Sequence, residues 1–288
     1  MNVFTKNSFT LSSWRNDEIN FYSSLYHGII QRNTTPMQNR IFAKVIILAG
    51  GKGTRMESDI PKTLHLLSEK AMINHIVESV LPVDSNPTII VGHKGEDVIA
   101  ETGGKYSYVW QKEQLGTGHA VLCAKETLLE IGPDYAIVVP GDAPLLKTET
   151  LKRLLEECAD THSAISLAVA SVPNFDGVHV GFERGGRILR NEEGGVRGII
   201  EWKDASEEER EIREINAGFY CFRADFLWEN IEKLESKNAA KEIYLTDLIA
   251  LAVKAGEKVS AVVLENPLEG LGVNTQEELA AAEKAMAL

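Results

Sequence analysis

Short apolar runs alternate with amphipathic stretches along the chain from residue 44 onward. Runs rich in β-branched or aromatic residues predict strands at residues 44–48, 87–91, 106–110 and 135–139. Apolar residues at helical spacing predict helices at 71–81, 98–101, 116–129 and 151–158. This alternation of strand and helix favours a parallel, doubly wound sheet with functional sites at the carboxyl ends of its strands.

The pattern changes after residue 163, where strand-like runs follow one another closely. They occupy residues 165–171, 178–182, 187–189, 196–202 and 217–222, and they predict an antiparallel part of a mixed sheet. The charge-rich stretch 205–213 predicts a solvated helix or loop, and 245–255 has the spacing of an amphipathic helix. A late strand is expected at 259–264, after which Thr275 and Glu278 form a capping box that opens the last helix.

Residues 1–42 differ from the rest because they show no sustained hydrophobic period. They also lack the basic start and apolar core of a signal peptide. We therefore expect a poorly ordered extension over 1–42 and a folded domain over 43–288. Met37, just before the first strand, is a candidate start of the functional chain.

Composition narrows the class of protein. The chain of 288 residues is 44% apolar and 25% charged, as in a soluble globule. No apolar run approaches the ~20 residues of a membrane helix, and a net charge of −12 argues against a general nucleic-acid binder. The scattered Cys123, Cys158 and Cys221 suit reduced thiols in a cytoplasmic protein.

The first strand leads into a glycine-rich, cationic loop. The glycines within 50–53 allow backbone N–H groups to turn toward an anion, and Lys52, Arg55 and Lys62 lie in or soon after the loop. A buried strand that feeds such a loop indicates a phosphate-binding site. The loop lacks P-loop spacing, and Met56 stands where a dinucleotide fingerprint needs its third glycine. For a Gly-Gly pair alone, a tight turn is the alternative interpretation.

A second candidate segment follows the third strand, at residues 111–120. The amide of Gln111 can both donate to and accept from the edge of a pyrimidine base. Gly116 and Thr117 lie at a predicted helix start, where free N–H groups can reach a base or a phosphate. A plain helix-start turn is the alternative, and His119 is interpreted as a packed neighbour rather than a catalyst.

Carboxylate and amide side chains supply further candidates. Asp142 follows a buried strand and suits Mg²⁺, which takes few carboxylates and completes its shell with phosphate oxygens and water. Glu201 supplies a carboxylate and Asn216 an amide, and such groups can bond several hydroxyls. The alternatives are that Asp142 and Asn274, the latter before the last helix, are turn residues and that Glu201 and Asn216 are polar residues of the surface.

The combined motif is more specific than its parts. Residues 48–56 read L-A-G-G-x-G-T-R-M, and residues 58–65 read S-D-x-P-K-x-L-H. This pattern resembles the signature of nucleotide-sugar pyrophosphorylases, and most of all the uridylyltransferase domain of bacterial N-acetylglucosamine-1-phosphate uridylyltransferases. The resemblance extends, with gaps, from about residue 44 to the C-terminus. It implies an α/β, Rossmann-like, GT-A-type nucleotidyltransferase fold with a mixed, mostly parallel sheet flanked by helices.

The resemblance also implies roles for the residues that match the family motif. Arg55 and Lys62 match the family's catalytic arginine and lysine on the triphosphate. The implied nucleotide-binding set is Leu48, Ala49, Gly50, Gly51, Gly53, Thr54, Lys62, Gln111, Gly116 and Thr117.

The sugar and the metal are assigned in the same way. The resemblance places Gly186, Glu201 and Asn216 on the sugar phosphate, and Asp142 with Asn274 on Mg²⁺. Two departures stand out: Pro140 precedes Gly-Asp where the family often has an aromatic or polar residue, and residues 183–185 interrupt its Gly-Tyr-Gly-Arg-Ile run. Sugar preference is therefore less firmly implied than nucleotide binding.

The implied reaction joins UTP and N-acetylglucosamine 1-phosphate, with Mg²⁺, into UDP-N-acetylglucosamine and pyrophosphate. One alternative is a pyrophosphorylase of the same fold that uses another sugar phosphate or base. A second is a silent sugar-nucleotide sensor, which has no need of the full catalytic and metal set. The bifunctional family members add a C-terminal left-handed β-helix of hexapeptide repeats. No such repeats occur here, so we expect no acetyltransferase activity and leave the oligomeric state open.

Overall fold

The structure is a computed structural model that describes residues 41–56 and 58–286. The predicted extension lies almost wholly outside these residues, so its boundary stays a prediction. The described fold begins beside Asp134. The backbone N–H of Phe42 donates to the Asp134 carboxylate at 3.0 Å, and the Asp134 N–H donates to the Phe42 carbonyl at 2.8 Å. This pairing leads the chain into the first strand.

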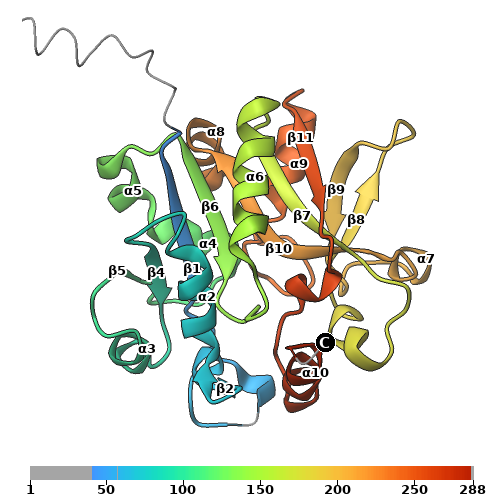
Figure 1. Ribbon diagram of the computed structural model, residues 1–288. Coiled ribbons are helices and arrows are strands. Elements are labelled where there is room, and N and C mark those ends of the chain that lie inside the picture. Colours follow the sequence, from blue (N-terminus) through green and yellow to red (C-terminus); the bar gives the residue numbers. More distant parts are fainter. Residues whose placement is uncertain (1–40, 57, 287–288) are drawn as a thin grey trace, which may run out of the picture. The chain divides into compact units, whose positions relative to one another are not determined.

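Nine strands of the described residues form one mixed sheet (Figure 1). Its main path runs β11-β7-β10-β6-β1-β4-β5. The bounds along that path are Val259–Val263, Ile165–Ser171, Glu214–Arg223, Tyr135–Pro140, Ala43–Ala49, Thr88–Val91 and Ser107–Trp110. The hairpin of β8 (Arg187–Arg190) and β9 (Val196–Ile200) pairs with β10, and the short strands β2 (Leu66–Leu67) and β3 (Lys70–Ala71) pair separately.

Strand direction follows the sequence prediction. Strands β5, β4, β1 and β6 are mutually parallel, with Ile47 of β1 opposite Ile89 on one side and Val139 on the other. Strand β10 runs antiparallel between β6 and β7, and β11 is parallel to β7. The mixed, mostly parallel sheet is confirmed. Its parallel strands place their carboxyl ends on one edge, where sites form in such folds.

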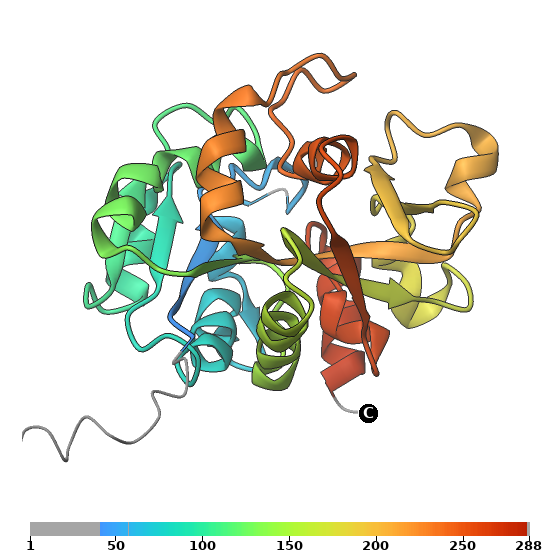
Figure 2. The same ribbon diagram turned by 90° about the horizontal axis from the view of Figure 1, so that it is seen from above.

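Helices cover both faces of the sheet, as Figure 2 shows from above. Consecutive residues of β1 explain the two layers: Ile47 packs in one apolar cluster, with α2, α6 and α10, whereas Ile46 packs in the other, with α4, α5, α8 and α9. The bounds of these helices, in chain order, are Met72–Val80, Thr117–Cys123, Lys125–Ile131, Thr148–Asp160, Ala224–Asn230, Asp247–Lys254 and Gln276–Met286. The remaining helices are α3 (Gly95–Glu101) and α7 (Glu207–Arg210). Within the described residues, no helix has both the length and the apolar character needed to cross a membrane.

Two predicted elements were wrong. The helix expected at 116–129 is two helices, because the Ala124 N–H bonds to the Val121 carbonyl at 3.0 Å, a tighter i→i−3 bond that ends α4 and lets α5 begin. The strand expected at 178–182 is a 3₁₀ helix, η4 (Gly177–Phe182). Its apolar residues pack against the core beside α10 instead of pairing with a strand. The capping box at Thr275 is confirmed, with both of its hydrogen bonds to Glu278 at 3.1 Å.

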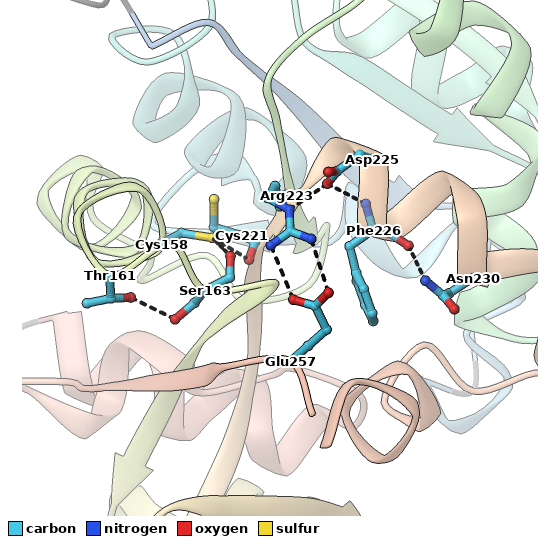
Figure 3. Close-up of polar contacts among 9 residues, drawn as sticks. All are labelled: Cys158, Thr161, Ser163, Cys221, Arg223, Asp225, Phe226, Asn230 and Glu257. Carbon is cyan, nitrogen blue, oxygen red and sulfur yellow. Dashed lines mark hydrogen bonds and ion pairs between the residues drawn. The ribbon is translucent and has the colours of Figure 1, made fainter. Parts of the chain in front are cut away.

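The cysteines belong to the scaffold. All three are free thiols, and Cys158 and Cys221 are buried. The Cys158 thiol donates to the carbonyls of Ser163 at 3.2 Å and Cys221 at 3.6 Å (Figure 3). Burial raises the pKa of the Cys221 thiol, and the neighbouring Cys158 raises it further. Protonated, buried thiols of this kind behave as small apolar groups.

Candidate functional site

A cavity of about 520 Å³ opens at the carboxyl ends of β1 and β6. Most of the residues that the sequence assigns to the nucleotide and the metal line it together. They are Leu48, Ala49, Gly50, Gly51, Gly53, Arg55, Lys62, Gln111, Gly116, Thr117, Asp142 and Asn274. Thr54 belongs to the same turn as Arg55. Segments that are distant along the chain therefore meet in one cavity.

The glycine-rich loop needs its glycines because other groups approach its backbone closely. A Cβ at Gly50 would lie 2.9 Å from Oε1 of Gln111. Gly53 has a φ of +61°, and a Cβ there would lie 2.6 Å from the Cβ of Lys62. The loop then closes with the 3₁₀ turn η2 (Thr54–Met56), which exposes Arg55 and buries Met56 in the core. The loop is thereby packed against both Gln111, of segment 111–120, and Lys62.

Lys62 lies at the centre of the polar contacts in the cavity. It begins the 3₁₀ turn η3 (Lys62–Leu64), and its ammonium group pairs with the carboxylate of Asp142. The same nitrogen donates to Oδ1 of Asn274 at 2.8 Å. The Val273 N–H donates to the Asp142 carbonyl at 2.8 Å, which joins the segment after β6 to the segment before α10. Three separate parts of the chain thus converge on one point.

The donor set at this point suits Mg²⁺. A carboxylate oxygen of Asp142 and the amide oxygen of Asn274 already converge on one positively charged atom, the ammonium nitrogen of Lys62. Hard oxygen donors with few carboxylates are what Mg²⁺ takes when phosphates and water complete its shell. Among the described residues no cluster of three or more His, Cys, Asp or Glu side chains could hold a metal alone. The residues present therefore fit a metal shared with a phosphate ligand.

Segment 111–120 is ordered by the buried amide of Gln111, a residue that is 4% exposed. Its Nε2 donates to the Gly116 carbonyl at 3.0 Å and lies 3.2 Å from Nδ1 of His119. Because Nε2 is committed to these groups, Oε1 faces Gly50 as an acceptor. His119 is a packed neighbour of the amide, as expected. The hydroxyl of Thr117 accepts from the Leu245 N–H at 3.0 Å, which fixes the start of α4.

Gly186, Glu201 and Asn216 form a second group beside the cavity, although they do not line it. The Asn216 N–H donates to the Gly186 carbonyl at 2.8 Å, and a Cβ at Gly186 would lie 3.4 Å from the Glu201 carboxylate. The pairing of β10 shifts register between Asn216 and Tyr220, and such an irregularity re-aims side chains. Within it, a Cβ on Gly218 would come 3.5 Å from Pro140 of the cavity wall. The sugar candidates are thus neighbours of the cavity.

The carboxyl of Glu201 has an unusual environment. Burial raises its pKa, the Thr246 hydroxyl opposes this shift by donating a hydrogen bond at 3.1 Å, and nearby carboxylates raise the pKa further. Those carboxylates are Asp247, Asp204 and Glu242. Burial and then Glu201 raise the pKa of Tyr244 to about 12. An ionised, desolvated carboxylate gains most from new hydrogen-bond donors, such as sugar hydroxyls.

Some residues that line the cavity were not singled out from the sequence, namely Thr63, Gln114, Ala120 and Glu242. Gln114 lies within segment 111–120, and its Nε2 donates to the Gln111 carbonyl at 3.0 Å, so the motif itself indicated it. Glu242 lies in a stretch without a motif. It reaches the cavity because Ile243 pairs with Leu115, its N–H donating to the Leu115 carbonyl at 2.7 Å. Only the tertiary structure reveals that contact.

The chain matches a known protein family and resembles curated proteins over most of its length. Residues 45–246 match the family described as the MobA-like NTP transferase domain. The chain is 44% identical over 243 residues to the bifunctional protein GlmU of Syntrophotalea carbinolica, which covers 84% of this chain and 50% of that relative. It is 40% identical over 242 residues to GlmU of Streptococcus agalactiae, covering 84% and 51%. The chain spans about half the length of these curated relatives.

Solved structures support the fold. A UDP-glucose pyrophosphorylase complexed with UDP-glucose aligns with a TM-score of 0.66 at 19% identity, covering 85% of this chain and 98% of the other. A putative glucose-1-phosphate thymidylyltransferase from Bacillus anthracis aligns with a TM-score of 0.64 at 21% identity, covering 84% and 94%. At this identity the likeness establishes the architecture, which is that of the predicted nucleotidyltransferase fold.

Proposed function

This chain belongs to the family of MobA-like NTP transferase domains, and we propose that it is a uridylyltransferase that forms UDP-N-acetylglucosamine and pyrophosphate from UTP and N-acetylglucosamine 1-phosphate. One observation carries the proposal. A single cavity is lined by a glycine-rich loop, by the cations Arg55 and Lys62, by the amide of Gln111 and by the carboxylate of Asp142. Identities of 40 to 44% with GlmU proteins favour this reaction within the family.

The nucleotide is proposed to lie along the cavity, with its triphosphate over the glycine-rich loop. Backbone N–H groups between Gly50 and Gly53 would hold the phosphates, because the three glycines of this stretch have no Cβ to block the approach. Arg55 and Lys62 would neutralise the phosphate charge. The Oε1 of Gln111 would accept from N3–H of uracil, with Gly116 and Thr117 against the base. Cytosine lacks that proton and would be disfavoured.

The sugar phosphate is proposed to enter beside Pro140, next to Gly186, Glu201 and Asn216. The Glu201 carboxylate would accept from sugar hydroxyls, which compensates for its desolvation. The Asn216 amide is already ordered, since its Oδ1 accepts from the Gly218 N–H at 3.0 Å and its Nδ2 donates to the Tyr220 hydroxyl at 2.6 Å. An ordered amide beside a carboxylate can recognise a defined pattern of sugar substituents through hydrogen bonds.

The reaction requires no covalent bond to the protein. A phosphate oxygen of the sugar phosphate forms a bond to the α-phosphorus of UTP, the bond from that phosphorus to the bridging oxygen of the β-phosphate breaks, and pyrophosphate leaves. Arg55 and Lys62 stabilise the charge that gathers on the transferring group and on the leaving group. Asp142 and Asn274 would hold Mg²⁺, which when bound supplies further charge neutralisation across the phosphates. Catalysis by this chain is then mainly positioning and electrostatic stabilisation.

We also place this reaction in the cytoplasm. The free thiols of Cys123, Cys158 and Cys221 support a reducing compartment. Detecting the protein in a periplasmic or extracellular fraction would contradict that location.

A pyrophosphate-release assay over a panel of nucleoside triphosphates and sugar 1-phosphates, with Mg²⁺, tests the proposed function. We expect the highest kcat/KM with UTP and N-acetylglucosamine 1-phosphate, and a lower value when either partner is changed. A higher value with another base or sugar would identify a different pyrophosphorylase of the same fold. Substrate binding without pyrophosphate release in any combination would favour a sugar-nucleotide sensor.

A further inference from the structure

The point assigned to the metal is filled by a side chain of the chain itself. The Lys62 ammonium pairs with the carboxylate of Asp142 and donates to Asn274 at 2.8 Å. The side chains of Lys62 and Asp142 are each only 17% exposed. We propose that Lys62 is an internal substitute for the metal ion, which keeps a divalent cation off Asp142 and Asn274 until a phosphate ligand draws the lysine away.

The two oxygen donors stay together without the lysine. The Val273 N–H donates to the Asp142 carbonyl at 2.8 Å, and this backbone bond does not involve Lys62. The backbone N–H of Asn274 also donates to the Glu278 carboxylate at 2.5 Å, which fixes the residue at the start of α10. A cation site therefore persists when the ammonium group leaves, and the lysine and a divalent cation compete for the same oxygens.

The side chain of Lys62 can also exchange its present partners for others in the same cavity. Its backbone is held against the glycine-rich loop, since a Cβ on Gly53 would meet the Lys62 Cβ at 2.6 Å. Gly53, Lys62 and Asp142 line one cavity. A lysine side chain is a flexible point charge with three donors, so rotation about its side-chain bonds can exchange the carboxylate for the oxygens of a phosphate on the loop.

This competition couples the two ligands. A divalent cation that binds the free protein must displace an ammonium group from a partly buried carboxylate, which weakens its affinity. A phosphate that recruits Lys62 removes the competitor, so the cation binds more tightly, and by reciprocity the cation favours the phosphate. The inference rests on the metal site of the proposed function. It does not depend on which base or sugar is used.

Binding of Mn²⁺ to the nucleotide-free protein tests the proposal, with free Mn²⁺ measured by electron paramagnetic resonance. We expect Lys62→Met to bind Mn²⁺ at least about tenfold more tightly than the wild type, because the competing charge in direct contact with Asp142 is gone. Lys52→Met is the matched control. Lys52 lines the same cavity and carries the same charge, but its side chain is exposed. We expect its Mn²⁺ affinity to change less than about threefold, because exposed charges are well screened.

Further variants locate the effect and guard against misfolding. Lys62→Gln removes the charge and keeps hydrogen-bonding capacity, so it should show the same gain as Lys62→Met. Adding Asp142→Asn to Lys62→Met should abolish the gain. An unchanged or weaker Mn²⁺ affinity in both Lys62 variants overturns the proposal, as does an equal gain in Lys52→Met. None of these measurements uses UTP or a sugar, so failure of the proposed reaction would be seen separately in the pyrophosphate assay.

Discussion

The two ends of the central sheet use charged side chains differently. Arg223 is the last residue of β10 and lies opposite the amino end of β6. Its Nε donates to Asp225 at 2.6 Å, and its two terminal nitrogens donate to Glu257 at 3.3 and 3.4 Å (Figure 3). These contacts join β10 to the turn before β11. At the carboxyl end, the ammonium group of Lys62 faces a cavity.

The amino end also contains a buried ion pair. Lys44, near the start of β1, donates to Asp84 at 2.7 Å, and both side chains are less than a tenth exposed. The carboxylate of Asp84 accepts from the Val45 N–H at 2.9 Å and from the Asn86 N–H at 3.1 Å as well. Every partner here is part of the scaffold, which makes this a structural ion pair.

The difference lies in what each charge can exchange. The partners of Arg223 and Lys44 are groups of the protein itself, and neither residue lines the cavity described above. Around Lys62, the proposed exchange takes place within one cavity: phosphate oxygens replace Asp142 as the partner of Lys62, and a metal ion replaces Lys62 as the partner of Asp142. We therefore expect mutations at the amino end to change the free energy of unfolding, and mutations at the carboxyl end to change turnover or substrate binding.

The largest effect on stability is expected for Asp84→Ala. It leaves the ammonium group of Lys44 buried without its carboxylate, and removal of one partner of a buried pair costs about 3–5 kcal/mol. Denaturant unfolding should show this loss, while kcat per folded molecule stays unchanged. The double variant Lys44→Met/Asp84→Leu is the control and should recover part of the stability. A loss below about 1 kcal/mol would mean that this pair does not anchor β1.

A smaller effect, confined to the nucleotide, is expected for Gln111→Ala. Loss of a buried amide that pairs with a base costs about 1–3 kcal/mol, so the Kd for UTP should rise roughly 5- to 150-fold. Calorimetric titration should show little change for N-acetylglucosamine 1-phosphate. Gln114→Ala, which removes a neighbouring amide from the cavity, should weaken UTP less. The assignment of Gln111 fails if UTP affinity is unchanged and sugar-phosphate affinity is lost.

Glu201→Gln should raise the stability of the fold while it weakens binding of the sugar phosphate. Because the folded protein has a raised Glu201 pKa, the stability that this carboxyl contributes is full below its ordinary pKa of 4.5 and falls as pH rises through the raised value. The amide has no such titration. The variant should therefore be more stable than the wild type at pH 7, with a higher Tm, and this gain should vanish toward pH 4.

The same variant should bind the sugar phosphate more weakly, because an amide cannot accept from hydroxyls on both of its heteroatoms. Thermal unfolding over pH 4–8 and the KM for N-acetylglucosamine 1-phosphate test both parts. A pH-independent stability difference would show that burial does not perturb Glu201. An unchanged KM would remove it from the sugar site.

The smallest effect is expected for Arg223→Gln. The side chains of Arg223 and Glu257 are 30% and 35% exposed, and such pairs contribute about 0–1 kcal/mol. Unfolding in low and in 1 M salt should show a loss within that range, and high salt should reduce it. Turnover should not change. A large loss of turnover without a loss of stability would erase the proposed division between the two ends.

Much of this arrangement could be predicted from the sequence, for identifiable reasons. Strands β1 and β6 are buried on both faces, so each forms a nearly continuous apolar run. The glycines of the loop are needed where side chains crowd the backbone, as at Gly50 and Gly53, and they therefore leave a motif. Such local constraints can be recognised without knowing the fold.

What could not be predicted depends on tertiary partners. The alternating apolar residues of 178–182 indicate a strand, yet their partner is a helix, and alternation alone does not identify the partner. Glu242 enters the cavity through the pairing of Ile243 with Leu115. The contact of Lys62 with Asp142 and Asn274 joins segments that are distant in sequence. The motif therefore indicated each of the three residues but not that the lysine pairs with the other two.

Asp142→Asn tests most directly whether the carboxyl end of the sheet is a metal-assisted nucleotidyltransferase site. The change keeps the shape of the side chain and removes one negative charge. Thermal unfolding and Mg²⁺-dependent pyrophosphate release should be measured on the same sample. We predict a Tm near that of the wild type and turnover lowered by roughly 10²-fold or more, with partial recovery at higher Mg²⁺. A lower Tm with near-normal turnover would contradict the account and leave Asp142 as a turn residue.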